Sequence, residues 1–320
     1  MYRSRIIGTG SFAPQKVLAN SDLEKLVETS DDWIMSRTGI KERRIASNGE
    51  STSLIAYNAA CKALEMAGVT AEELDLIIVG TITPEMSTPS VACLLQDKLN
   101  ASRAVAFDIS AACAGFIYGL SIADNFIKNG VYAKVLVLGV ETLSKITDYQ
   151  DRSTCILFGD GGGAVVLTGE EGERGIMSTH IYSNGSYGNL LYAPQATAES
   201  VPRRDHFLRM DGNRVFKVAV RSMEEAAVVA LEHNGVGIDD IDLLIPHQAN
   251  SRIIKSLAKR LALVSEKIFV NIERYGNTSA ASVPIALDEA NRQNRMQPDD
   301  LILLDAFGAG FTWGSALVRW

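Results

Sequence analysis

Three residues of this 320-residue chain carry side chains that can do chemistry and stand next to predicted strands: Cys113, His247 and Asn277. A thiol can act as a nucleophile, and an imidazole or an amide can donate hydrogen bonds to a developing negative charge. If the fold brings the three side chains together, they indicate nucleophilic catalysis through a cysteine.

Cys113 lies in "DISAACAGF" (108–116), between a predicted strand at 102–109 and a predicted helix that ends at "NG" (129–130). The helix follows from the spacing of its apolar residues, Phe116, Leu120, Ala123 and Ile127. Free backbone N–H groups and the helix dipole stabilise a thiolate at a first helical turn, so we expect a nucleophilic sulfur. The alternative is a buried structural cysteine.

His247 directly follows a predicted strand in "LLIPHQAN" (243–250), where functional side chains of α/β proteins gather. Asn277 lies in "NIERYGNTSAASVP" (271–284), where a predicted strand at 268–272 leads through a turn into a helix with Pro284 early in it. A hydrogen-bonded core histidine and an ordinary turn asparagine are the structural alternatives. The other histidines lie in less suggestive segments: His180, His206 and His233.

Three glycine-rich segments receive different interpretations. The turn at 308–310 joins two predicted strands and can present backbone N–H groups to an oxyanion. The "GTG" at 8–10 is no dinucleotide fingerprint, because Ala13 stands where the third glycine would be. "GDGGGAVVL" (159–167) leads into a strand and indicates packing.

Two stretches of the chain align without a gap: "ALEMAGVTAEELDLIIVG" (63–80) and "ALEHNGVGIDDIDLLIPH" (230–247). Each predicts a helix that ends at a glycine, an acidic turn and a continuous apolar strand, which is typical of sheets covered on both faces. The sequence therefore predicts an α/β protein made of two similar halves, residues 1–172 with the cysteine and residues 173–320 with the histidine and the asparagine.

Composition excludes several other classes. The net charge of −7 argues against a general nucleic-acid binder, because phosphate contacts need a broad basic surface. No apolar stretch approaches the ~20 residues of a membrane span, and no signal peptide is recognisable. The four cysteines are far apart and histidines are few, so we expect no metal site, no disulfide framework and a cytoplasmic location: Cys61, Cys93, Cys113 and Cys155.

These motifs together resemble β-ketoacyl-acyl carrier protein synthase III, from "IIGTGSFAP" through "AACAGF", "PHQAN" and "GNTSAASVP" to "FGAGFTWGSALVRW". The resemblance implies a homodimer with the duplicated thiolase-like fold and a five-layered α-β-α-β-α core. It implies an acyltransferase that condenses an acyl-CoA primer, acetyl or short-chain, with malonyl-acyl carrier protein to start fatty acid synthesis. No cofactor is implied beyond the CoA thioester substrate.

The resemblance also implies roles for individual residues. Cys113 would carry the acyl group, and His247 and Asn277 would stabilise the enolate formed by decarboxylation. The backbone N–H groups of Cys113 and Ala309 would form the oxyanion hole, with Ala309 where the family usually has glycine.

Binding residues follow in the same way. Trp33 and Arg37, four residues apart, resemble the pair that sandwiches the CoA adenine, with Thr29 and Arg152 nearby. The expected carrier-protein docking residues are Gln248, Asn250 and a basic stripe, Arg252, Lys255 and Lys259. The expected acyl pocket contains Leu143, Leu190 and Phe307, and Thr88 from the partner subunit, in place of the family's aromatic residue, closes its end.

Three alternatives fit part of the pattern. A related thiolase-like condensing enzyme of secondary metabolism uses the same Cys-His-Asn set, although the basic stripe favours a carrier-dependent enzyme. In a cysteine thioesterase or hydrolase, Asn277 would orient His247 as a general base and water would be the second substrate. A non-catalytic binding module should lack one of the three residues, and all three are present.

Overall fold

The computed structural model describes residues 2–194 and 206–320. Its first sheet has the strand order β1-β7-β6-β4-β5, and its second sheet has the order β11-β12-β13-β8. The strands of the first sheet are β1 (Tyr2–Phe12), β4 (Leu76–Gly80), β5 (Val105–Ile109), β6 (Lys134–Thr142) and β7 (Asp160–Glu171). Those of the second are β8 (Gly175–Ser183), β11 (Leu243–Pro246), β12 (Leu301–Gly308) and β13 (Thr312–Arg319).

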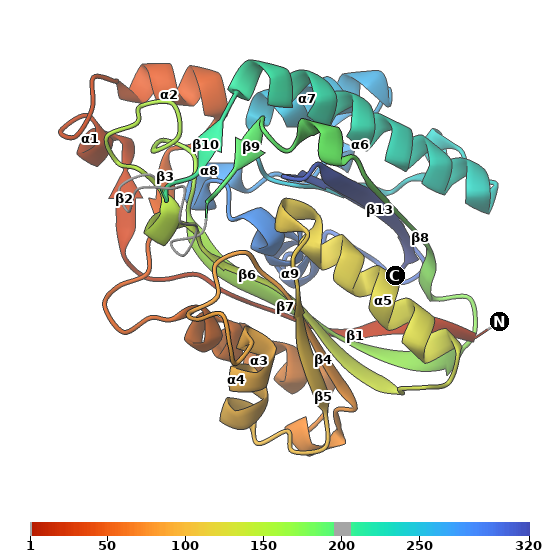
Figure 1. Ribbon diagram of the computed structural model, residues 1–320. Helices are drawn as coiled ribbons and strands as arrows, with labels where there is room; N and C mark the ends of the chain where they lie inside the picture. Colours follow the sequence, from red (N-terminus) through yellow and green to blue (C-terminus); the bar gives the residue numbers. More distant parts are fainter. Residues whose placement is uncertain (1, 195–205) are drawn as a thin grey trace.

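Helices cover both sheets on both faces (Figure 1). Helices α3 (Thr52–Ala67) and α4 (Val91–Leu99) cover the outer face of the first sheet, and α6 (Gly212–Asn234) and α7 (Ser251–Arg260) cover the outer face of the second. Helices α5 (Gly115–Lys128) and α9 (Ser282–Arg292) lie between the sheets and contact both. The predicted five-layered α-β-α-β-α architecture is confirmed, and no described helix is long and apolar enough to cross a membrane.

Smaller elements lie on one side of these layers (Figure 1). They are β2 (Val17–Ala19), α1 (Asn20–Leu23), α2 (Asp31–Thr38), β3 (Glu42–Arg44), β9 (Leu191–Tyr192), β10 (Arg209–Met210) and α8 (Ile272–Tyr275). Short 3₁₀ turns connect several of them to the sheets.

The two segments that align in sequence also fold alike. Helices α3 and α6 end at Gly68 and Gly235, whose φ angles of 63° and 62° favour glycine. A 3₁₀ turn follows each glycine and leads into β4 or β11. The first sheet takes its strands from Tyr2–Glu171 and the second from Gly175–Arg319, which agrees with the division at 172/173 that we propose.

Glycines in β1 and β7 allow helices to approach the sheet closely. A Cβ on Gly8 or Gly10 would lie 2.3 Å from a backbone oxygen of α3, and one on Gly163 would lie 2.6 Å from the backbone of α9. The "GTG" and "GDGGG" segments therefore serve packing, which the sequence had indicated for "GDGGG".

The predicted strand at 268–272 is wrong. Only Ile268 forms a bridge, with Leu244, before the chain turns into α8. The buried side chain of Gln248 takes up the next backbone groups: its Nε2 donates to the Phe269 carbonyl (3.2 Å), and its Oε1 accepts from the Asn271 N–H (3.0 Å). A side chain thus replaces the strand pairing that the apolar pattern suggested.

Candidate active site

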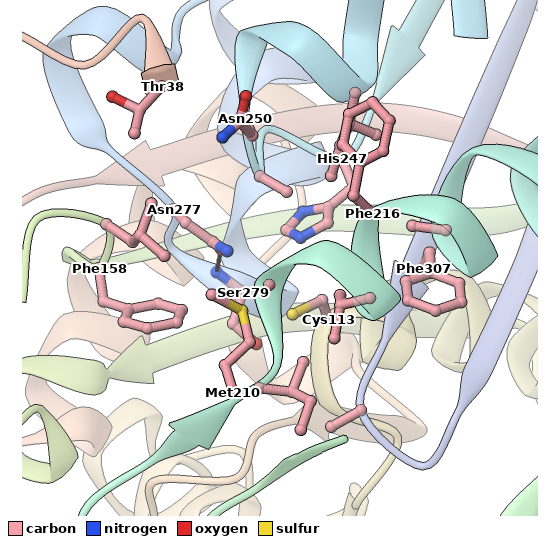
Figure 2. A pocket seen from close by; sticks show the side chains of 18 of the residues that line it. Thr38, Cys113, Phe158, Met210, Phe216, His247, Asn250, Asn277, Ser279 and Phe307 are labelled. Carbon is pink, nitrogen blue, oxygen red and sulfur yellow. Dashed lines mark hydrogen bonds between the residues drawn. The ribbon is translucent and has the colours of Figure 1, made fainter. Parts of the chain in front are cut away.

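Cys113, His247 and Asn277 line one cavity of about 610 Å³, together with Ala309 (Figure 2). They come from four separate parts of the chain: Cys113, His247 and Asn277 each lie between a strand or turn and a following helix, and Ala309 lies in the turn between β12 and β13. Figure 2 shows the Cys113 sulfur next to the His247 ring and the side chains of Asn277 and Ser279. The arrangement that the sequence analysis required is therefore present.

Cys113 lies in a 3₁₀ turn (Ala112–Ala114) immediately before α5. Ala112 before it has a φ of 44°, an uncommon left-handed conformation for a residue with a side chain. The end of β12 passes so close that a Cβ on Gly308 would lie 2.5 Å from the Cys113 nitrogen. This tight packing fixes the direction of the cysteine backbone and makes glycine necessary at 308.

The expectation that the helix start would stabilise the Cys113 thiolate is wrong for this state of the site. Burial raises the pKa of the thiol to about 12, while a hydrogen bond from Ser279 and the cysteine's own N–H act weakly in the opposite direction. The cavity removes water from the sulfur, and this outweighs the donors at the start of α5. Cys113 is therefore a neutral thiol in this buried setting.

His247 is buried directly after β11, and its Nδ1 lies 2.6 Å from the Ser282 hydroxyl. The same hydroxyl accepts from the Gln248 N–H (3.4 Å), so we assign its hydrogen to His247 Nδ1 and the ring proton to Nε2. Burial lowers the pKa of His247 to about 3. The residue is therefore a neutral imidazole, and its second nitrogen is free to donate a hydrogen bond.

Asn277 is held by its backbone and by one side-chain atom. Its N–H donates to the Leu157 carbonyl (2.8 Å) and its carbonyl accepts from the Gly159 N–H (3.0 Å). Its Oδ1 accepts from the Ser279 N–H at 2.8 Å. The amide oxygen is thus occupied, which leaves the Nδ2 hydrogens to serve the cavity as donors.

Ala309 stands in the turn between β12 and β13 and also lines the cavity. Positive φ in this turn belongs to Gly310 (133°), and Ala309 does not share it. The alanine therefore causes no backbone strain where the family usually has glycine. The role of its N–H as a donor in the oxyanion hole stays a prediction.

The predicted CoA residues divide into two groups. Trp33 and Arg37 on α2 line the cavity, whereas Thr29 and Arg152 do not. The prediction paired Trp33 with Arg37, but it is the Arg152 guanidinium that lies over the Trp33 ring, 4.3 Å from its centre. Residues far apart in sequence form this pair, and which arginine faces the CoA adenine together with Trp33 stays a prediction.

The predicted docking residues also divide. Arg252, Lys255 and Lys259 are exposed along α7, and Asn250 caps that helix through its Oδ1 (2.8 Å to the Arg252 N–H). Gln248 is 1% exposed and hydrogen-bonded to backbone, so its predicted contact with a carrier protein is wrong.

Sequence reasoning missed a second basic row beside the first. Arg214 and Lys217 are exposed on α6, which contacts α7, and their three-residue spacing in an amphipathic helix was a usable signal. Lys217 and Arg252 both line the cavity, so basic side chains of two helices stand at its rim. Ser279 and Ser282, the partners of Asn277 and His247, were missed as well, because nothing in the sequence separates them from other small residues.

The predicted acyl-pocket residues are partly placed. Leu143 and Phe307 line the cavity, but Leu190 is packed into the core below α6, and its neighbour Leu191 lines the cavity instead. Adjacent residues at the start of a strand point to opposite sides. An error of one residue in the prediction therefore placed the core residue Leu190 in the cavity wall instead of Leu191. Thr88 is exposed and is not among the residues that line this cavity.

No group of three or more potential metal ligands occurs among the described residues. The four cysteines are free thiols.

The sequence of this chain is similar to that of known proteins. Sequence profiles described as 3-oxoacyl-[acyl-carrier-protein (ACP)] synthase III match residues 107–185, and the profile of its C-terminal part matches residues 231–320. A relative named beta-ketoacyl-[acyl-carrier-protein] synthase III, from Xanthomonas campestris pv. campestris, is 53% identical over 99% of this chain and 98% of its own length. The chain belongs to this synthase III family.

Two further members support the assignment. The Caldanaerobacter subterraneus subsp. tengcongensis synthase III is 51% identical over 98% of this chain and 97% of its own length. The crystal structure of the Aquifex aeolicus VF5 synthase III, 53% identical, superposes with a TM-score of 0.95 over 99% of this chain and all of that one. The family's thiolase-like fold is thus present in full.

Proposed function

We propose that this chain condenses an acyl-CoA primer with malonyl-acyl carrier protein, releasing carbon dioxide and forming β-ketoacyl-acyl carrier protein. The reaction would start fatty acid synthesis and use no resident cofactor. The observation that carries the proposal is the meeting of Cys113, His247 and Asn277 in one cavity of a synthase III fold.

In the first half-reaction the Cys113 sulfur attacks the carbonyl carbon of the acyl-CoA thioester. The new carbon–sulfur bond replaces the bond to CoA, and the thiol proton leaves with the CoA sulfur. Because His247 is neutral with a pKa of about 3, it is a poor acceptor for this proton. The donors at the start of α5 are the stabilising groups for the transient thiolate.

In the second half-reaction, malonyl thioester loses carbon dioxide and its thioester oxygen acquires negative charge. His247 Nε2 and Asn277 Nδ2 are the donors we assign to this oxygen, since their other polar atoms are occupied by Ser282 and Ser279. Each such donor in a site without water contributes roughly 3–4 kcal/mol to the transition state. The enolate carbon then attacks the acyl carbonyl on Cys113.

The tetrahedral intermediate of each step needs its own donors. We assign the backbone N–H groups of Cys113 and Ala309, because the close approach at Gly308 brings the 308–310 turn to the cysteine backbone. Collapse of the intermediate in the second step breaks the carbon–sulfur bond and releases the cysteine as a thiolate, which takes up a proton from solvent to become the thiol again.

CoA would enter over α2. The stacked Trp33–Arg152 pair offers a planar cation and an indole, between which a nucleobase can insert once the two separate. Arg37 and Lys217 line the same opening and suit the phosphates of CoA. Thr29 belongs to the proposed CoA site because its buried hydroxyl has no hydrogen-bond partner among the described residues.

Acyl carrier proteins are acidic, and the basic side chains of α7 and α6 surround the cavity rim of an otherwise acidic chain. This is the docking face that we propose. A homodimer is supported by β5, whose outer edge is unpaired and whose Val105 is 47% exposed. The free cysteines agree with a cytoplasmic location.

A cysteine hydrolase is the less favoured function. It needs His247 as a general base toward water, and a buried imidazole with a pKa of about 3 is a weak base at neutral pH. The same neutral imidazole is well suited to donate a hydrogen bond to an enolate.

The deciding experiment is mass spectrometry of the intact protein. Incubation with acetyl-CoA should add one acetyl group to Cys113, and malonyl-acyl carrier protein should then remove it with release of carbon dioxide. Cys113→Ala should acquire no acetyl group. His247→Ala and Asn277→Ala should be acetylated but decarboxylate at least a hundredfold more slowly. Free acetate as the main product would identify a hydrolase instead.

A further inference from the structure

Glu141, at the end of β6, is a fully buried carboxyl group that the proposed reaction does not use. No ion pair with it occurs in the part of the chain that the structure describes. Its Oε2 accepts from the hydroxyls of Thr83 (2.5 Å) and Thr81 (3.2 Å), and the Ile82 N–H lies 3.1 Å away. A carboxyl buried with only neutral donors is costly, so its retention calls for a reason.

The remaining oxygen of Glu141 faces the active site. Its Oε1 accepts from the Ser279 hydroxyl at 3.1 Å. Ser279 in turn donates its backbone N–H to Asn277 Oδ1 at 2.8 Å. Ser279 thus connects the buried carboxyl with Asn277, and Figure 2 shows Ser279 on the same side of the cavity as Asn277.

Ser279 also has an unusual backbone conformation. Its φ is 51°, in the left-handed region that a residue with a Cβ avoids at a cost of roughly 1–2 kcal/mol. In this conformation its N–H points at the Asn277 oxygen. The hydrogen bond to Glu141 and the packing of Gly139 against the Ala280 carbonyl hold the turn in place.

We propose that Glu141, acting through Ser279, is a positioning residue that sets the orientation of the Asn277 amide for decarboxylation. The inference rests on the proposed function. While Ser279 N–H holds Oδ1, the Nδ2 hydrogens face the enolate oxygen. If Ser279 relaxes to a negative φ, this N–H turns away, and the amide can rotate to present an oxygen, which repels the enolate.

The orientation matters for one half-reaction only. Decarboxylation places negative charge on the oxygen that Asn277 serves, whereas acylation of Cys113 places it on the oxyanion held by backbone N–H groups. Loss of the Glu141–Ser279 hydrogen bond should therefore slow decarboxylation selectively. A merely structural role would lower both half-reactions together.

The test compares Ser279→Ala and Glu141→Gln with the unmodified protein. Acetylation of Cys113 is followed by mass spectrometry, and decarboxylation of malonyl-acyl carrier protein by carbon dioxide release. We expect Ser279→Ala to slow decarboxylation at least tenfold and acetylation less than threefold. Glu141→Gln fills the same space with one acceptor oxygen fewer. It should also slow decarboxylation more than acetylation, but both losses should be smaller than in Ser279→Ala.

A double-mutant comparison asks whether the effect passes through Asn277. In an Asn277→Ala background, Ser279→Ala should cause no further loss, since no amide remains to be oriented. Thr81→Val is the matched control, because it removes a hydrogen bond on the side of Glu141 away from the site, and it should change both rates less than threefold.

Equal losses in both half-reactions, or an undiminished effect of Ser279→Ala in the Asn277→Ala background, would overturn the inference. Unchanged decarboxylation in Ser279→Ala would do the same. If Glu141→Gln does not fold, the Ser279→Ala and Asn277→Ala pair decides alone. Failure of the unmodified protein to acetylate Cys113 or to decarboxylate would instead contradict the proposed function.

Discussion

At the scale of single residues, burial rather than neighbouring charge sets the protonation state of the groups around the site. It raises the pKa of Cys113 to about 12 and that of Glu141 to about 7, and it lowers that of His247 to about 3. Each of these shifts favours the neutral form. Neutral groups around the reacting atoms strengthen the hydrogen bonds that an enolate would receive, while the basic side chains of Lys217 and Arg252 stand at the rim of the cavity.

The residue types of the site were visible in the sequence, but their charge states were not. Cys113, His247 and Asn277 could be chosen because each follows a predicted strand. The pKa of Cys113 depends on how completely the end of β12 and the turn at Ser279 cover it, and such long-range packing is not written in local spacing.

Asp305 provides a test of this effect on stability. It is fully buried on β12, its carboxyl oxygens have no hydrogen-bond partner among the described residues, and burial raises its pKa well above the ordinary value. Between the unfolded and the folded pKa the unfolded chain has lost the proton and the folded chain has kept it. Stability therefore falls as pH rises through this window.

Asp305→Asn removes that penalty because an amide does not ionise. We expect its Tm at pH 8 to exceed that of the unmodified protein by about 2 °C or more, since ~1 kcal/mol shifts the Tm of a protein this large by about 2 °C. The difference should disappear near pH 4. Asp97→Asn on the exposed face of α4 controls for the loss of one negative charge. A variant that melts lower at pH 8 would show that Asp305 is charged in the folded state.

At the scale of elements, prediction succeeded where local patterns decide the structure. The helix–turn–strand units at 63–80 and 230–247 form as expected, because apolar periodicity and a terminal glycine are local signals. The strand expected at 268–272 does not form, because the side chain of Gln248 occupies the backbone groups that a neighbouring strand would have paired. A local sequence pattern carries no information about a side chain that is distant in the sequence.

The basic stripe of α7 leads to a prediction about the carrier protein. Arg252 also lines the cavity and lies 5.6 Å from the Phe216 ring, so the exposed Lys255 and Lys259 are the cleaner targets. Lys255→Glu with Lys259→Glu should lower kcat/KM for malonyl-acyl carrier protein about tenfold at low salt and leave acetylation by acetyl-CoA unchanged. Such charges act mainly on association, so the difference should shrink above ~0.1 M salt.

Lys98→Glu provides the control for this test. It lies on α4, beneath the first sheet and across the molecule from α7 (Figure 1). It should affect neither half-reaction. If Lys255→Glu with Lys259→Glu slows acetylation as much as use of the carrier protein, the stripe supports the His247 region and is no docking face.

At the scale of the whole molecule, the layered fold was predictable because the duplication and the continuous apolar strands constrain it. The acyl pocket was less predictable, because its walls come from several elements and, in our proposal, from two subunits. Thr88 does not line the cavity around Cys113, but its loop is tied to the edge strand β5. The Asp108 carboxylate on β5 accepts from the N–H groups of Val91 and Ala92, at the start of the helix that follows that loop.

A partner subunit seated on β5 would therefore meet the Thr88 loop. Where a bulky aromatic would close the end of the pocket, threonine leaves room for a few more carbons, and each buried methylene contributes about 0.8 kcal/mol. Apolar pockets discriminate weakly between chains that differ by single methylenes. We expect butyryl-CoA and isobutyryl-CoA to acylate Cys113 within roughly tenfold of acetyl-CoA. Competition among acetyl-, butyryl-, isobutyryl- and hexanoyl-CoA, read by mass spectrometry of the acylated protein, gives the preference directly.

Thr88→Phe should narrow this range to acetyl-CoA, because a ring would refill the end of the pocket. Thr88→Val keeps the side-chain volume and should leave the range unchanged, which separates an effect of size from an effect of the lost hydroxyl. An unmodified protein that prefers acetyl-CoA by more than a hundredfold would show that Leu143, Leu191 or another wall of the cavity limits the primer. The same conclusion would follow if Thr88→Phe accepted butyryl-CoA as well as the unmodified protein does, since a residue that closes the pocket must exclude the longer chain when it is enlarged.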